Sequence, residues 1–255
     1  MKVLVLGTGF AGRAALNMLA SQGLKDISGT YRHSTANRGI SKLNGEASLY
    51  ECDINEAVSI ENVLNEIKPD VIFHFCGYVS VFSSLKNPTS TFQTNVIGTI
   101  NLLEAVKKVV PHAKVLLPGS AEQYGFVSDE NMPIKESYPL NPVNPYAISK
   151  KSQEEIGLYY FKQFGLNLYF TRTFHCTGPY QPIGFVCSDI AKQVVSVERG
   201  ISSSIKIGNL EAKRDFTDIR DVVEGYWQIV NEGAPGQIYN VCFGKSISIQ
   251  NILDK

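Results

Sequence analysis

The chain has 255 residues, enough for one large α/β domain or for a domain with a smaller lobe. Its 24 Lys and Arg balance its 24 Asp and Glu, so no overall field attracts it to nucleic acid or to an anionic membrane. No apolar run reaches the ~18 residues of a membrane-spanning helix, and no cysteine or histidine pair has metal-ligand spacing, so we expect a cytoplasmic protein with reduced thiols and no metal.

The first strand and the loop after it predict a dinucleotide-binding site. Lys2–Leu6 is a short run of β-branched and leucine residues, followed by G-T-G-F-A-G and a helix-compatible segment over Arg13–Ser21. In such a loop the first glycine makes the turn, the second lets pyrophosphate approach the backbone, and the third lets helix pack on strand. The phosphates then meet a helix N-terminus. An ordinary tight turn is the alternative. The expected loop residues are Gly7, Gly9, Phe10, Ala11 and Gly12.

The second strand, Ile27–Tyr31, bears on the choice of cofactor. NAD sites place an acidic residue after this strand to bind the ribose 2′-hydroxyl. Here the strand is followed by Arg32, and no acid occurs until Glu46. A guanidinium suits a 2′-phosphate, so we expect NADP rather than NAD, with Arg38 as a second basic residue nearby. The alternative is that Arg32 is only a surface charge.

Strands and helices continue to alternate after this point. The next predicted strands are residues 48–52 and 71–77, and the predicted helices are residues 56–67 and a helix from about Pro88 that contains Asn95. The unbroken apolar character of residues 71–77 is typical of a parallel strand buried on both faces. His74 in that strand is interpreted as a core histidine. The alternation predicts βαβ units with right-handed crossovers.

A general acid–base pair is predicted near the middle of the chain. Tyr146 and Lys150 follow the helix-start signal of Pro145 and stand four residues apart, so they share one helix face. A fixed ammonium favours phenolate, so we expect a lowered pKa for Tyr146, suited to proton transfer. Ser120 follows an apolar strand over residues 113–117, at the edge where open α/β sheets bind ligands. The alternative is a Tyr and a Lys on a solvated helix face.

Five motifs in this order, GTGFAGR, FHFCG, TNVIGTINLLEA, GSAEQYG and NPYAISK, resemble the extended short-chain dehydrogenase/reductase family over essentially the whole chain. The resemblance implies that Tyr146 exchanges the proton, Lys150 holds the nicotinamide ribose and Ser120 bonds the reacting carbonyl. It also implies further cofactor contacts beside the adenine, beneath the cofactor and in the following helix. Asp53 and Ile54 would flank the adenine. The residues beneath the cofactor are Phe75, Cys76 and Gly77, in place of the more usual Leu-Ala-Ala, and the residue in the following helix is Asn95.

The second half resembles the branch that contains GDP-mannose 4,6-dehydratase and the GDP-4-keto-6-deoxymannose reductases. By this resemblance Arg214 grips the sugar-nucleotide diphosphate, a task that suits a bidentate guanidinium. The alternative for Arg214 is an ion pair with Asp215 or Asp218. His175 stands where the branch usually has Asn, which changes the donors and acceptors offered to the sugar. Three segments carry the resemblance: residues 172–179, 184–189 and 208–218.

Glu122 bears on the type of reaction. In the family's 4,6-dehydratases a Glu two places before Tyr-Gly acts as a base, and Glu122 has that position. Those dehydratases, however, have Thr rather than Ser at the position of Ser120, and their glycine loop is longer. We therefore expect NADPH-dependent reduction of a nucleotide-linked 4-keto-6-deoxyhexose. A 4,6-dehydratase or 4-epimerase is the alternative. A non-catalytic NADP-binding regulatory subunit is an alternative of another class, against which the intact Ser120, Tyr146 and Lys150 speak.

The expected architecture is α/β, with a doubly wound parallel Rossmann sheet over residues 1–170 and a smaller mixed α/β substrate lobe mostly over residues 171–255. The lobe is built mainly from Gly178–Ile207, some of its segments return to the first domain, and its C-terminal part is expected to be missing after Lys255. The nucleotide sugar is expected in the crevice between the two.

A homodimer is predicted from the helices over residues 95–109 and 145–164. They carry apolar and aromatic residues on more than one face, so one face packs on the sheet and the surplus favours a partner pair of helices. The residues in question are Leu102, Ile156, Tyr159, Tyr160 and Phe164.

Overall fold

The computed structural model of the chain describes residues 1–32 and 47–254; Arg38 and Glu46 lie outside them. The described residues form a seven-stranded sheet in the order β3-β2-β1-β4-β5-β6-β9, in which every neighbouring pair is parallel. The predicted doubly wound parallel sheet is thus confirmed. Its strands are β1 Val3–Leu6, β2 Ile27–Tyr31, β3 Ser48–Glu51, β4 Val71–His74, β5 Lys114–Ser120, β6 Asn167–Thr173 and β9 Ile238–Val241.

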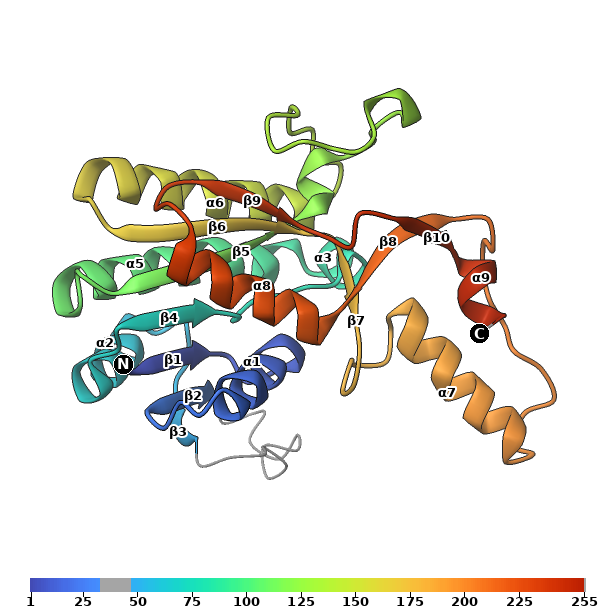
Figure 1. Cartoon of the computed structure of the whole chain (residues 1–255), viewed down its shortest axis with the longest axis horizontal. Helices are drawn as coiled ribbons and strands as arrows, with labels where there is room; N and C mark the ends of the chain where they lie inside the picture. Colours follow the sequence, from blue (N-terminus) through green and yellow to red (C-terminus); the bar gives the residue numbers. More distant parts are fainter. Residues whose placement is uncertain (33–46, 255) are drawn as a thin grey trace.

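Helices cover both faces of this sheet (Figure 1). On one face α1 packs beside α8, and on the other α2, α5 and α6 pack beside one another. The central strands are buried on both faces, which is why their sequences are apolar without alternation. The helices are α1 Phe10–Ser21, α2 Ala57–Ile67, α5 Gly98–Val109, α6 Pro145–Phe164 and α8 Ile219–Glu232.

The segment between β4 and β5 differs from the prediction. Strand β4 ends at His74 rather than at residue 77, and a short helix α3, Val81–Lys86, was not predicted. The helix predicted from about Pro88 consists of α4 Pro88–Phe92, a π-helical turn over Gln93–Ile97 and then α5. The π turn holds Asn95, and turns of this kind occur often at functional sites.

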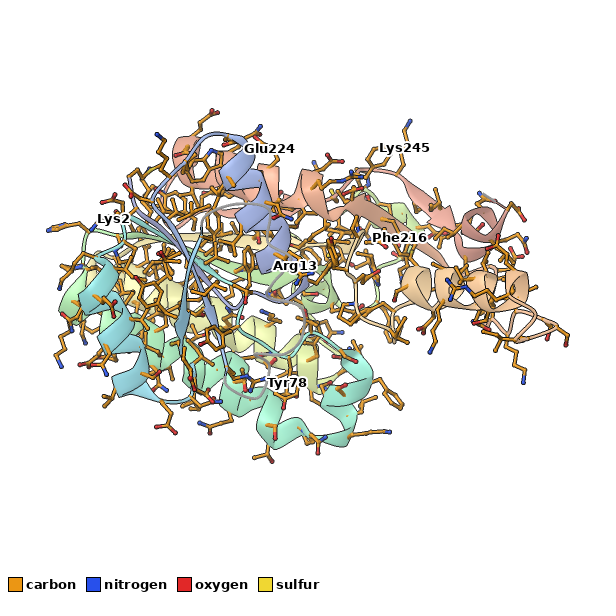
Figure 2. All side chains as sticks on the ribbon, turned by 90° about the horizontal axis from the view of Figure 1, so that it is seen from below. Lys2, Arg13, Tyr78, Phe216, Glu224 and Lys245 are labelled. Carbon is orange, nitrogen blue, oxygen red and sulfur yellow. The ribbon has the colours of Figure 1, made fainter. Side chains whose placement is uncertain are left out.

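The smaller lobe contains a mixed three-stranded sheet in the order β10-β8-β7, with β7 and β8 parallel and β8 and β10 antiparallel. Figures 1 and 2 show this sheet and α7 extending to one side of the large sheet, with Phe216 of β8 on that side. The elements of the lobe are β7 His175–Thr177, α7 Val186–Glu198, β8 Lys213–Asp218, β10 Ser246–Ser248 and α9 Ile249–Leu253.

The two parts are interleaved in the sequence. The chain passes from β6 into the small lobe, and α8 and β9 then return to the large sheet. The domain boundary at residue 170 stays a prediction, since β6 itself runs to Thr173. In residues 1–32 and 47–254, no helix combines the length and apolar character needed to cross a membrane.

Candidate active site

The glycine loop has the shape that a dinucleotide requires. Gly7 has a φ of +90°, and a Cβ there would stand 3.0 Å from the backbone nitrogen of Cys76. A Cβ on Gly12 would collide with the Gly7 carbonyl, so the third glycine lets α1 approach the loop. At Gly9 a Cβ would meet nothing within 4 Å, which leaves open space beside the backbone. Gly9 caps α1 without a side-chain hydrogen bond, so the first N–H groups of α1, from Phe10 and Ala11 onward, suit a pyrophosphate there.

The carboxyl ends of β2 and β4 meet beside this loop. The Thr30 hydroxyl accepts a hydrogen bond from the Gly7 N–H at 2.9 Å, which fixes the loop to β2. Burial raises the pKa of the Cys76 thiol to about 12; the charge of Arg32 acts to lower this pKa and that of Asp53 to raise it. Arg32 and Asp53, both predicted cofactor contacts, therefore lie within electrostatic reach of Cys76, a third.

Three other predicted cofactor residues serve packing or loop geometry. Ile54 is a core residue that packs against the Gly98 position of α5. Phe75 stacks its ring on that of Tyr226 in α8, with 5.8 Å between ring centroids. A Cβ on Gly77 would stand 3.0 Å from Oδ1 of Asn95, so this glycine allows the loop after β4 to approach the π turn.

Asn95 uses its whole side-chain amide inside the protein. Its Oδ1 accepts from the Tyr78 N–H at 2.8 Å, and its Nδ2 donates to the Tyr78 carbonyl at 3.1 Å and to the Ser149 hydroxyl at 2.9 Å. Ser149 in turn donates to the carbonyl of Tyr146. Asn95 therefore ties the loop after β4 to the first turn of α6, and a direct contact with a cofactor stays a prediction.

The structure brings Ser120, Tyr146 and Lys150 together. Ser120 is the last residue of β5, and Tyr146 and Lys150 lie in the first two turns of α6, which packs against β5. The start of α6 is fixed by the side chain of Asn144, whose Oδ1 accepts from the Ala147 N–H at 2.8 Å. All three predicted side chains are buried, and Ser120 lies close enough to the Tyr146 hydroxyl for hydrogen bonding to lower the pKa of the phenol. These contacts would let the two hydroxyls meet a single carbonyl oxygen.

The expected lowering of the Tyr146 pKa is wrong in sign. Burial raises this pKa to about 12; the hydrogen bond to Ser120 opposes the shift, and Cys176 and Glu122 add to it. Lys150 points its ammonium at the Pro118 carbonyl and at Oε1 of Gln153, each at 2.8 Å, and burial lowers its pKa to about 8. Removing the phenolate from water thus outweighs the hydrogen bond with Ser120, so Tyr146 is protonated at neutral pH.

Glu122 lies in the 3-10 turn after β5, and His175 is the first residue of β7 in the small lobe. Glu122 accepts a hydrogen bond from Nδ2 of Asn144 at 3.2 Å, and its charge acts on the pKa values of both Tyr146 and His175. Burial lowers the pKa of His175, and the charge of Arg214 lowers it further. The His175 ring packs edge-on against Phe216, with 5.7 Å between centroids.

Arg214 lies in β8, exposed and within electrostatic reach of His175. Asp218 pairs instead with Arg220 at 2.6 Å, and Asp215 accepts hydrogen bonds from the N–H groups of residues 243 and 244. Among the residues that the structure describes, the ion pair considered from the sequence for Arg214 is therefore not formed. Binding of a diphosphate by Arg214 stays a prediction.

Three buried residues behind the site were not predicted: Gln123, Glu154 and Arg172. Two signals in the sequence could have indicated them. Glu154 stands four residues after Lys150, on the same helix face as Tyr146 and Lys150. Arg172 interrupts an otherwise apolar and hydroxylic strand, where a charge needs a partner.

His74 is a core residue, as predicted, but only half of its ring is satisfied. Nε2 lies 3.0 Å from the Thr99 hydroxyl, while Nδ1 is buried with no partner in the described part of the chain. Over the same residues, no three His, Cys, Asp or Glu side chains gather to form a metal site.

Comparison with known proteins identifies relatives of this site. The family model described as GDP-mannose 4,6 dehydratase matches residues 4–255. GDP-6-deoxy-D-mannose reductase of Pseudomonas aeruginosa is 32% identical over 203 residues, which cover 79% of this chain and 66% of that protein. A GDP-mannose 4,6-dehydratase of Sordaria araneosa is 26% identical over 249 residues, 97% of this chain and 45% of that protein. The chain thus spans just under two thirds of the length of the first relative and less than half of the second.

A solved structure described as RMD from Pseudomonas aeruginosa complexed with NADPH matches all of this chain and 80% of its own, with a TM-score of 0.83 and 27% identity. The UDP-glucose 4-epimerase of Thermus thermophilus in complex with NAD has the same fold, with a TM-score of 0.87 and 24% identity over all of this chain and 81% of its own. The family model spans nearly the whole chain, and the glycine loop and the Ser-Tyr-Lys cluster lie within the matched residues. The chain therefore belongs to the GDP-mannose 4,6-dehydratase family of extended short-chain dehydrogenases/reductases.

Proposed function

We propose that the chain is an NADPH-dependent reductase of a nucleotide-linked 4-keto-6-deoxyhexose. The observation that carries this proposal is the buried cluster of Ser120, at the carboxyl edge of β5, with Tyr146 and Lys150 on the first two turns of α6. Reduction of a ketone ends with an alkoxide that must receive a proton. A phenol whose pKa is raised by burial can give this proton.

The chain's own residues would divide the work as follows. Gly9 and the N-terminus of α1 would receive the pyrophosphate, and Arg32 would bind the 2′-phosphate. Bound NADPH would supply the hydride. Lys150 would hold the nicotinamide ribose, Ser120 would donate a hydrogen bond to the reacting carbonyl, and Tyr146 would give its proton to the forming alkoxide, an arrangement similar to an oxyanion site.

The comparisons support a GDP sugar as substrate. The relative with 32% identity is a GDP-6-deoxy-D-mannose reductase, and the similar solved structure with 27% identity contains NADPH. On this chain the sugar nucleotide would lie between the large sheet and the small lobe. Arg214 would bind its diphosphate and His175 would contact the sugar, since both lie in strands of the small lobe within electrostatic reach of each other.

A GDP-mannose 4,6-dehydratase is the second candidate, and Glu122 is what favours it. The carboxylate acts electrostatically on Tyr146, and a dehydratase needs a second base in that region to remove a proton from carbon. The fungal relative is an enzyme of this kind.

The deciding experiment uses the wild-type chain and a Glu122→Gln variant. With GDP-4-keto-6-deoxymannose and NADPH, we expect the wild type to consume one NADPH for each 4-hydroxy product formed. Glu122→Gln should keep most of this activity, because ketone reduction removes no proton from carbon. Formation of the 4-keto sugar from GDP-mannose without added NADPH, abolished in Glu122→Gln, would instead identify a dehydratase. Binding of NADPH with no turnover of either substrate would favour the regulatory subunit.

A further inference from the structure

A buried ion pair lies directly behind the turn that carries Ser120. Arg172 of β6 binds Glu154 of α6 through two hydrogen bonds, Nε to Oε2 at 2.9 Å and Nη2 to Oε1 at 2.7 Å. Each side chain is only 5% exposed. A buried pair of this kind is weak grounds for a stabilising role, because its desolvation cost offsets its attraction. What else the carboxylate binds is therefore informative.

Gln123 connects this pair to Ser120. Its Nε2 donates to Oε2 of Glu154 at 2.9 Å, and its Oε1 accepts from the Ser120 N–H at 2.8 Å. Gln123 has no exposed surface, and a Cβ on the neighbouring Gly119 would collide with its Oε1. The amide is thus enclosed, and the ionised carboxylate beside it decides which way it faces.

The charge of Glu154 fixes this orientation. An ionised carboxylate only accepts hydrogen bonds, so Gln123 must turn its NH2 group toward Glu154. The carbonyl oxygen of the same amide is then the group that faces the Ser120 N–H. Arg172 holds the carboxylate in place with its bidentate guanidinium, and this geometry is the strongest that an Arg–carboxylate pair adopts.

The same turn sets the place of the Ser120 hydroxyl. Ser120 Oγ accepts from the Glu122 N–H at 3.2 Å and lies within hydrogen-bond reach of the Tyr146 hydroxyl. One capping box therefore holds Ser120 through two hydrogen bonds. The side chain of Gln123 binds its backbone N–H, and the backbone N–H of Glu122 binds its hydroxyl. Gln153, the residue before Glu154, accepts a hydrogen bond from the Lys150 ammonium.

We propose that Glu154 is a positioning residue for the reaction: held by Arg172, it fixes the amide of Gln123, which in turn fixes Ser120 relative to Tyr146. This inference rests on the proposed function for the catalytic role of Ser120. It assigns no contact with substrate to Glu154, which acts through two other residues.

A double-mutant cycle with Glu154→Gln and Ser120→Ala tests the effect on rate. A glutamine at 154 can present either a donor or an acceptor, so the orientation of Gln123 is no longer imposed. We expect Glu154→Gln alone to lower kcat roughly 10- to 100-fold, as a misplaced catalytic group does, while NADPH affinity is unchanged. In the Ser120→Ala background the same change should cost almost nothing further, because there is no hydroxyl left to position. Equal losses in both backgrounds would assign Glu154 a merely structural role and overturn the proposal.

Amide hydrogen exchange tests the link without substrate or cofactor. In Glu154→Gln we expect the Ser120 N–H to exchange faster, while the amides of Leu116 and Phe170 in the same sheet stay as in the wild type. The control is Glu61→Gln, which breaks the surface pair of Glu61 with Lys108 and should change neither kcat nor exchange at Ser120. Unchanged exchange at Ser120 in Glu154→Gln would overturn the proposal.

The two measurements separate this proposal from the proposed function. If Ser120→Ala leaves kcat unchanged, the catalytic role of Ser120 fails, and the exchange result still decides whether Glu154 holds the turn. If Glu154→Gln does not fold, Gln123→Met keeps the ion pair and removes the connecting amide. We expect it to show the same loss of kcat and the same faster exchange at Ser120. Wild-type kcat and exchange in Gln123→Met would overturn the proposal.

Discussion

Tyr146 and Lys150 share one face of α6 but face different surroundings. The phenol is next to Ser120, and the ammonium is held by a backbone carbonyl and Gln153. Tyr146→Phe removes the proton donor and keeps the ring, so kcat for ketone reduction should fall about 100-fold or more. NADPH affinity, measured by fluorescence titration, should be nearly unchanged. Retention of most of the wild-type kcat would contradict the assignment of Tyr146.

Arg32 is the residue on which cofactor choice depends. Its charge acts on the pKa of Cys76, whose backbone nitrogen lies beside Gly7 of the glycine loop. A charge-assisted hydrogen bond to a 2′-phosphate contributes roughly 1.5–3 kcal/mol, which corresponds to about 10- to 150-fold in affinity. We expect NADPH to bind more tightly than NADH, with the gap reduced in Arg32→Ala and largely closed when Arg38, outside the described residues, is also changed.

Titration of both cofactors against each variant measures this gap. The matched control is Lys25→Ala, which removes an exposed charge two residues before the start of β2. It should leave the difference between the NADPH and NADH affinities unchanged. Equal affinities of the wild type for NADPH and NADH would mean that Arg32 is only a surface charge.

His74 makes the stability of the protein sensitive to acid. Burial and the charge of Lys150 lower the pKa of His74 to about 3. The Thr99 hydroxyl donates to the Asn95 carbonyl at 2.8 Å, so Nε2 of His74 is the donor to Thr99 and the ring is neutral in the folded state. Below the unfolded pKa of about 6.5 the unfolded chain binds one more proton than the folded chain.

The contribution of His74 is thus fully present above about pH 6.5 and is lost as the pH falls toward 3. The free energy of unfolding should decrease by about 1.4 kcal/mol per pH unit more in the wild type than in His74→Gln, which keeps a donor for Thr99. Urea unfolding at a series of pH values between these limits checks this. Parallel profiles for the two proteins would exclude such a role for His74.

At the scale of elements, strands and the long helices could be predicted because their signals are local. Strand β2 and helix α6 begin and end where the sequence indicates: an apolar run for β2, and Asn144, Pro145 and Gly165 as start and stop signals for α6. The π turn around Asn95 could not be predicted, because the bonds of Asn95 to Tyr78 and Ser149 join parts of the chain that no periodicity connects.

The homodimer predicted from the helices over residues 95–109 and 145–164 stays a prediction, and three of the residues chosen from the sequence are not on the exposed surface. Leu102 is fully buried in the core, Ile156 packs against the core, and Tyr160 is buried, with its hydroxyl donating to Glu104 at 2.6 Å. The exposed apolar residues on α6 are Ile148 and Tyr159, which share a face, and Phe164; on α3 they are Phe82 and Leu85.

Light scattering at micromolar concentration should give the mass of a dimer. Tyr159→Glu should shift the protein toward the monomer, because a carboxylate would then be buried in an apolar interface. Phe126→Glu is the control, since Phe126 is 86% exposed and lies in the loop after Tyr124, on neither α3 nor α6. A monomer mass for the wild type would reject the dimer.

At the scale of the whole molecule, the site is only partly visible in the sequence. Tyr146 and Lys150 could be predicted because four residues of helix separate them, and Ser120 because it ends an apolar strand. Glu154 and Arg172 lie 18 residues apart on a helix and a strand, and their meeting depends on how α6 packs on the sheet. The sign of the Tyr146 pKa shift depends on burial, which also appears only in the folded chain.

The return of β9 to the large sheet has a consequence for synthesis of the protein. Strand β9 pairs with β6 through contacts such as that of Phe170 with Ile238, and β7, α7 and β8 of the small lobe lie between the two strands in the sequence. During translation β6 leaves the ribosome well before β9 does. The nascent sheet then has an unpaired edge at β6, and such edges promote aggregation. The sheet reaches its full width only when nearly all of residues 1–241 have left the exit tunnel. Chaperone binding during translation is therefore expected to be greatest after β6 emerges and to end once β9 does.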